Sequence, residues 1–176
     1  MNDKQIKLTQ ATYAKGRTAT IKFQQYTNSR PALTLVDETG PLMVASVNLP
    51  DIDIPAGMIA IKTWSENDRI QDDLIKNHII APDVEFTVKS GHVEVPIYTL
   101  LWHPDMPTIG QSIMIHPDGS YDLKEDIPED EWEAKSAGDV LILPADTTEM
   151  QLSNRLMPMQ LPADTYISII LELFPD

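Results

Sequence analysis

The chain contains no cysteine, which excludes disulfide bonds, thiolate metal ligands and a cysteine nucleophile together. Its seven glycines are scattered, and none belongs to a glycine-rich phosphate-binding loop. The first residues lack the apolar core of a secretory signal, and no apolar run is long enough to span a bilayer. We therefore expect a soluble protein of a reducing compartment such as the bacterial cytoplasm, without membrane contact.

Positive charge is scarce, and it is nearly absent from the second half of the chain. In total, 13 Lys and Arg residues stand against 27 Asp and Glu residues, a net charge of −14. Residues 1–100 hold ten basic and 12 acidic residues, a net of −2, whereas residues 101–176 hold three basic and 15 acidic residues, a net of −12. A field of this sign repels nucleic acid and attracts basic proteins. The segregation predicts a C-terminal surface for a basic partner, with no direct binding of nucleic acid.

The first hundred residues predict short strands around one helix. Apolar and polar residues alternate, or short apolar runs stand between turn residues, in six segments: 19–26, 32–37, 42–48, 58–63, 83–89 and 92–101. An apolar stripe at helical spacing runs from Ile70 to Ile79, with Ser65 as a candidate N-cap and Pro82 as a stop. We expect a helix over residues 65–80, with Asp73 among the acidic residues that suit its N-terminal half.

The second half also predicts strands. The expected strands are 109–116, 121–123, 140–144 and 166–174. The pentapeptide Leu-Pro-Ala-Asp-Thr occurs at 143–147 and 161–165, and we interpret both copies as corners between strands. The expected fold is therefore a β-rich α+β protein, with an antiparallel sheet and one packed helix in residues 1–101. A smaller, β-sandwich-like unit would follow in residues 102–176.

A resemblance adds to this reading of the first half. The segments that support it are ATIKFQQY (19–26), RPALTLVD (30–37), ASVNLPD (45–51), MIAIKTWSEND (58–68) and GHVEVPIYTLL (91–101). Residues 19–101 resemble a small family of uncharacterised proteins encoded by bacteriophages, plasmids and conjugative elements. The resemblance implies an origin in a mobile genetic element, but it brings no catalytic residue to this chain. The acidic residues from Trp102 onward lie outside it.

Two patterns could support metal chemistry. His-Pro-Asp occurs at 103–105 and 116–118, and two imidazoles with two carboxylates could form a metal site. No third histidine stands nearby, and Asp118 is explained by a turn. Gly138-Asp139 followed by an apolar strand looks like the second motif of cupin-type barrels, but residues 145–149 lack the required histidine. We expect no metal, no cofactor and no catalytic residue, with a metal-dependent hydrolase as an alternative.

The acidic stretch over residues 122–133 is the main candidate site. It can be a solvated segment that serves solubility, or it can mimic the closely spaced phosphates of DNA. Our main hypothesis is a non-enzymatic accessory protein of a mobile element that inhibits a basic, nucleic-acid-handling host protein, such as a restriction or CRISPR component. A phage structural or assembly module is an alternative. The expected contacts are seven carboxylates with one aromatic anchor: Asp122, Glu125, Asp126, Glu129, Asp130, Glu131, Glu133 and Trp132.

Overall fold

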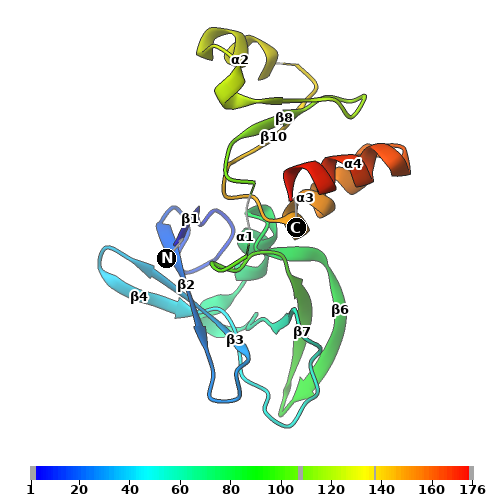
Figure 1. Cartoon of the computed structure of the whole chain (residues 1–176). Coiled ribbons are helices and arrows are strands. Elements are labelled where there is room, and N and C mark those ends of the chain that lie inside the picture. Colours follow the sequence, from blue (N-terminus) through cyan, green and yellow to red (C-terminus); the bar gives the residue numbers. More distant parts are fainter. Residues whose placement is uncertain (1–2, 107–108, 137, 175–176) are drawn as a thin grey trace. The chain divides into compact units, whose positions relative to one another are not determined.

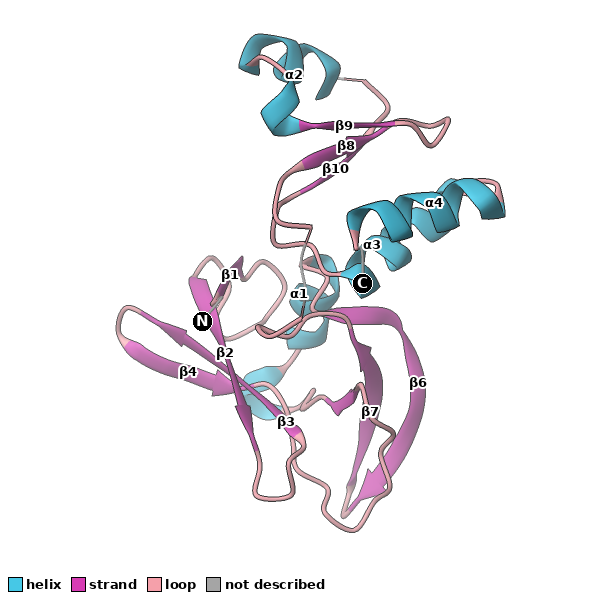
Figure 2. Ribbon diagram, viewed as in Figure 1, coloured by secondary structure: helices cyan, strands magenta, loops and turns pink. Residues whose placement is uncertain are grey.

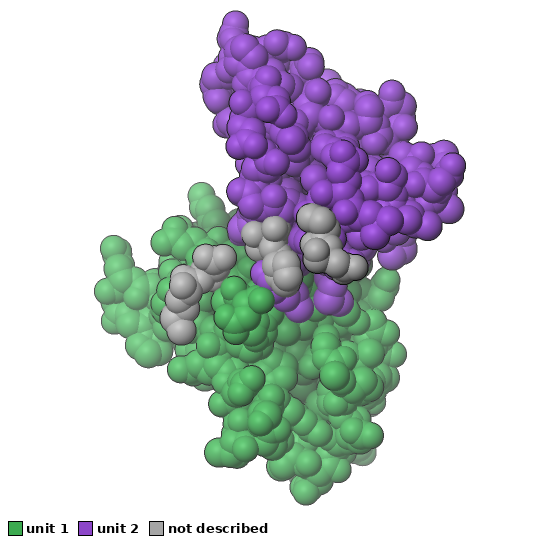
Figure 3. Space-filling view, viewed as in Figure 1, with its two compact units in different colours: residues 1–105 green, residues 106–176 purple. Residues whose placement is uncertain are grey.

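The protein consists of two compact units, residues 1–105 and 106–176 (Figures 1 and 3). The computed structural model describes residues 3–106, 109–136 and 138–174. Each unit has an apolar core of its own, and the three sheets that these described residues form are antiparallel (Figure 2). The β-rich α+β class predicted from the sequence is confirmed. Among the described residues, no helix is both long and apolar enough to cross a membrane.

The described residues of the N-terminal unit form two sheets. The first has the strand order β1-β2-β3-β4, with bounds Lys4–Lys7, Thr18–Gln25, Pro31–Asp37 and Gly40–Val44. The second has the order β5-β7-β6, and the bounds of β5, β6 and β7 are Met58–Ala60, Ile80–Ser90 and Val93–Leu100. Most of these strands coincide with the predicted segments. β1 was not predicted, because four residues give too little alternation to identify a strand.

The helix of this unit is shorter than predicted. A 3₁₀ turn, Ser65–Asn67, precedes α1, Ile70–Lys76. Asp68 and Arg69 separate them, and Arg69 has the left-handed conformation, with a φ of 64°. Ser65 forms the first residue of the turn and provides no side-chain cap. The predicted stripe is nevertheless correct, because Ile70 and Leu74 are fully buried in the core.

Asp73 connects α1 to the start of the chain. Its carboxylate accepts hydrogen bonds of 2.8–3.2 Å from the backbone N–H groups of Thr9, Gln10 and Ala11. The hydroxyl of Thr9 adds a bond of 3.0 Å. Burial would raise the pKa of Asp73, but these donors hold the pKa below its ordinary value. Asp73 therefore fixes the segment after β1, a role beyond the helix-dipole effect expected from the sequence.

The described part of the C-terminal unit combines one small sheet with helices. The sheet has the order β10-β8-β9, and the bounds of β8, β9 and β10 are Ile113–Ile115, Tyr121–Leu123 and Leu141–Leu143. Three helices follow these strands or lie between them: α2 (Glu129–Ser136), α3 (Glu149–Leu156) and α4 (Ala163–Leu173). The core of the unit is formed mainly by aliphatic side chains of β8, β10, α3 and α4.

The strand predicted over residues 166–174 is wrong, because this segment lies in α4. Its run of alternating apolar residues also contains a helical stripe, in which Ile169 is buried and Tyr166, Ile170 and Leu173 pack against the core. Tertiary packing selects this second periodicity over β propensity. The expectation of a sandwich-like unit changes accordingly. In the described residues the unit has a single three-stranded sheet, and α3 and α4 complete its core.

Both copies of Leu-Pro-Ala-Asp-Thr lead into helices, so their interpretation as corners between strands is also wrong. The first copy ends beside Thr148, whose hydroxyl accepts a hydrogen bond from the Gln151 backbone N–H, while the Gln151 side chain accepts one from Thr148. This reciprocal arrangement is a capping box at the start of α3. The second copy places Pro162 immediately before α4. The repeat therefore marks helix N-termini.

Candidate functional site

The predicted contact carboxylates lie on β9, on the 3₁₀ turn Lys124–Asp126 and on α2. All of them are exposed except Asp122, which is half-buried. Acidic residues fill the first turn of α2, where the positive end of the helix dipole favours them. We call these seven carboxylates the acidic surface: Asp122, Glu125, Asp126, Glu129, Asp130, Glu131 and Glu133.

Two lysines neutralise only part of the acidic surface. Lys124 Nζ lies 3.2 Å from Glu129, and Lys135 Nζ lies 3.1 Å from Asp122 and 3.3 Å from Glu131. His116 Nε2, 3.0 Å from Asp122, and Lys135 hold the pKa of Asp122 below its ordinary value. Within the described residues, the other four carboxylates form no ion pair: Glu125, Asp126, Asp130 and Glu133.

Trp132 is buried and does not present an aromatic anchor. Its side chain is 6% exposed, although its neighbours on α2 face solvent. Lys124 Nζ lies 5.9 Å from the centroid of its ring, within the range of a cation–π interaction. The ring therefore holds α2 and the preceding turn in place, and the contacts available to a partner on α2 are the carboxylates.

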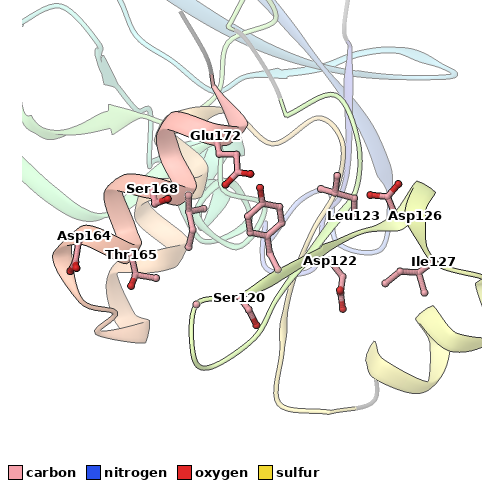
Figure 4. Close-up of a pocket in the computed structure, with 12 residues that line it drawn as sticks. Ser120, Asp122, Leu123, Asp126, Ile127, Asp164, Thr165, Ser168 and Glu172 are labelled. Carbon is pink, nitrogen blue, oxygen red and sulfur yellow. The ribbon is translucent and has the colours of Figure 1, made fainter.

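An acidic groove of about 760 Å³ lies between β9, the following 3₁₀ turn and α4 (Figure 4). Asp122 and Asp126 lie on one side, and α4 contributes Asp164 and Glu172 on the other. None of the described residues that line the groove is a lysine or arginine. The charge of its lining favours cationic groups.

The lining of the groove is partly apolar. Tyr121 and Ile169 line it together with the carboxylates. Burial, followed by a hydrogen bond to Glu172, raises the pKa of Tyr121 to about 12. The phenol is therefore neutral at physiological pH and acts as a hydrogen-bond donor to Glu172. This contact joins the two sides of the groove.

The shape of the groove also depends on Gly119, in the turn between β8 and β9. Its φ is +86°, and a Cβ on this residue would overlap the side-chain methyl of Thr165 on α4. Only glycine combines this conformation with such a close approach. The turn and α4 can therefore form one end of the groove.

We expect Gly119→Ala to lower the free energy of unfolding of the C-terminal unit by about 2 kcal/mol, from backbone strain and overlap together. Gly110→Ala is the matched control, because Gly110 has a φ of +75° with no atom within 4 Å of its Cβ position. It should cost about 1 kcal/mol. Urea unfolding of both variants and of Gly119→Ala/Thr165→Ser checks this, since the serine removes the methyl. Equal losses for Gly119→Ala and Gly110→Ala would contradict the close approach.

The structure brings part of the predicted site together and extends it. Asp122 and Asp126 line the groove, whereas the carboxylates of α2 are not among its lining residues. Asp164 and Glu172 were missed because their segment was predicted as corner and strand. The signal that could have found them is the spacing of Asp164, Ser168 and Glu172, which are four residues apart and so share one face of a helix.

The two His-Pro-Asp elements have local structural partners. His103 Nδ1 accepts a 3.0 Å hydrogen bond from the Asp105 N–H, and its ring packs edge-on against Phe23. Asp118 accepts bonds from the N–H and hydroxyl of Ser120, and this closes the turn between β8 and β9. Across residues 3–106, 109–136 and 138–174, no three His, Asp or Glu side chains are grouped as metal ligands would be.

No family model, curated protein or solved structure matches the chain. The charge, burial and geometry of its own residues are therefore the basis for assigning a function.

Proposed function

We propose that this protein is a non-enzymatic binding protein whose acidic surface engages and inhibits a basic, nucleic-acid-handling protein. In this proposal it is an accessory protein of a mobile genetic element and acts in the cytoplasm of a bacterial host. The main support is the concentration of exposed carboxylates, four of them without an ion pair among the described residues, on α2 and on the turn that follows β9. A partner that normally contacts phosphates would find acceptor groups of the same charge there.

Electrostatic attraction between the acidic surface and a basic partner affects the rate of association more than the final affinity. A one-signed surface steers a partner of opposite sign and raises the association rate by about 10- to 1,000-fold. The three lysine–carboxylate pairs are exposed on at least one side, and such pairs contribute little to stability. The carboxylates can therefore exchange their lysine partners for a binding protein at little cost to the fold.

The decisive variant combines Glu129→Gln, Asp130→Asn, Glu131→Gln and Glu133→Gln. We expect it to slow association with a basic partner isolated from a bacterial lysate by at least about tenfold at low salt, because the local field is lost. The association rate of the parent should fall by a similar factor when the salt concentration is raised, because the Debye length falls from about 10 Å at 0.1 M to about 3 Å at 1 M. Surface plasmon resonance with the purified partner measures both effects, and duplex DNA should compete with the parent protein.

A matched control removes the same number of negative charges, four, from the N-terminal unit. Asp51→Asn, Asp53→Asn, Asp83→Asn and Glu94→Gln change only exposed positions. This variant should associate at nearly the parental rate. Equal rates for the parent and the α2 variant would show that the acidic stretch serves solubility alone and would refute the proposal. If both quadruple variants slowed association equally, the effect would come from the net charge of the protein and not from the acidic surface.

A further inference from the structure

α4 has two apolar faces, and only one of them packs against the unit. Ile169 is buried in the core, together with partly buried residues of the same stripe. On the solvent side, Ile167 and Leu171 are 53% and 65% exposed. They are four residues apart, so they are neighbours on the helix surface. Single exposed aliphatic residues are common, but two adjacent ones on an 11-residue helix form an unpartnered apolar face.

This apolar face borders the acidic groove. Asp164 precedes Ile167 by three residues and Leu171 by seven, and this places the three side chains next to one another along the helix. Asp164, Ser168 and Glu172 in turn line the groove, as Figure 4 shows. One continuous surface of the C-terminal unit therefore offers an apolar strip beside two rows of carboxylates.

We infer that this surface is the docking site of a basic amphipathic helix, and this rests on the proposed function in taking the partner to be basic. Such a helix would place its aliphatic residues on Ile167 and Leu171. Its lysines or arginines would reach the carboxylates of the acidic groove. Amphipathic helices commonly bind through apolar anchors spaced about one helical turn apart.

The charge and the apolar strip of this surface disfavour the alternative occupants. A second copy of this chain would bring two rows of carboxylates against each other, and like charges facing one another cost free energy. Nucleic acid and anionic membranes are repelled for the same reason. A purely basic, extended chain would satisfy the carboxylates but would leave the two aliphatic side chains uncovered. A basic amphipathic helix complements both features.

The probe is a synthetic peptide of about 16 residues, roughly 24 Å long when helical, with leucines at helical spacing and lysines on the flanks. A second peptide of the same charge has glutamine in place of each leucine. We expect the parent protein to bind the leucine peptide about tenfold more tightly than the glutamine peptide, because only the former buries apolar area. Titration calorimetry at low and high salt measures both affinities.

The test variant is Ile167→Gln/Leu171→Gln, and its matched control is Met150→Gln/Met157→Gln, which removes two other exposed apolar residues of the same unit. The test variant should lose about tenfold in affinity for the leucine peptide and keep its affinity for the glutamine peptide. The control should bind both peptides as the parent does. Thermal melting of both variants establishes that the unit still folds.

The outcomes separate this inference from the proposed function. Equal binding of the two peptides by the parent, with strong salt dependence, would overturn the amphipathic docking site and leave the acidic surface as a basic-protein site. Parental affinity of the Ile167→Gln/Leu171→Gln variant for the leucine peptide would also overturn it. Displacement of the leucine peptide by spermine at equal concentration would show a site for small cations and would likewise refute a helix-binding surface.

Discussion

Asp73→Asn should lower the free energy of unfolding of the N-terminal unit by about 3 kcal/mol. The amide that replaces the carboxylate can still accept a hydrogen bond through its oxygen, but its NH₂ group would face backbone N–H donors. Hydrogen bonds to a charged group contribute about 1.5–3 kcal/mol each when broken singly, and Asp73 receives four donors from Thr9, Gln10 and Ala11. Chemical denaturation followed by circular dichroism measures the loss.

The neighbouring Asp72 provides the control. Its carboxylate pairs with Arg69 at 2.9 Å and is 34% exposed, so Asp72→Asn makes the same charge change where solvent can compensate. We expect it to cost less than about 1 kcal/mol. Similar losses for Asp72→Asn and Asp73→Asn would show that the hydrogen bonds of Asp73 contribute no more than a surface charge does.

The effect of Asp73 also has a defined pH dependence. Because the folded state holds the pKa of Asp73 below its ordinary value, the folded state favours the ionised carboxylate more than the unfolded chain does. The resulting stabilisation is complete above the unfolded pKa of about 3.9 and is lost as the pH falls toward the folded pKa. The difference in stability between the parent and Asp73→Asn should therefore be largest near neutral pH and should shrink below about pH 4.

Trp132→Ala should destabilise the C-terminal unit by about 3 kcal/mol, because truncation of a buried tryptophan removes apolar burial and leaves a cavity. Trp132→Phe keeps a ring in place and should cost about half as much. Thermal melting of both variants measures this, with peptide binding in parallel. Unchanged melting of Trp132→Ala combined with weaker binding would restore the aromatic anchor that the sequence suggested.

The fold could be predicted where a local pattern is unambiguous. The alternation in β2, with Ile21 buried, and the stripe of Ile70 and Leu74 each have one interpretation in a half-buried element. The segment of α4 has two interpretations, because the spacing of its apolar residues fits both a strand and a helix. Packing against α3 and the small sheet decides between them, and a local pattern does not contain that information.

The site could be predicted only where its residues are close in the sequence. The carboxylates of α2 are adjacent in the sequence, so their grouping follows from composition alone. Asp164 and Glu172 come close to Asp122 and Asp126 only through the packing of α4. The burial of Trp132 could not be predicted from the sequence either. A single aromatic residue among acidic residues is expected to be exposed, and only the packing of α2 shows that it is buried.

The contacts of Asp73 also bear on the order in which the N-terminal unit can assemble. They join residues 62–64 positions apart, and closing a loop of that size must precede any gain from the contact. During synthesis, the hairpins of β2, β3 and β4 can pair early, but the N–H groups of Thr9, Gln10 and Ala11 lack their Asp73 acceptor until α1 has emerged. The segment over residues 9–11 should therefore be among the last parts of the N-terminal unit to gain protection from hydrogen exchange during folding.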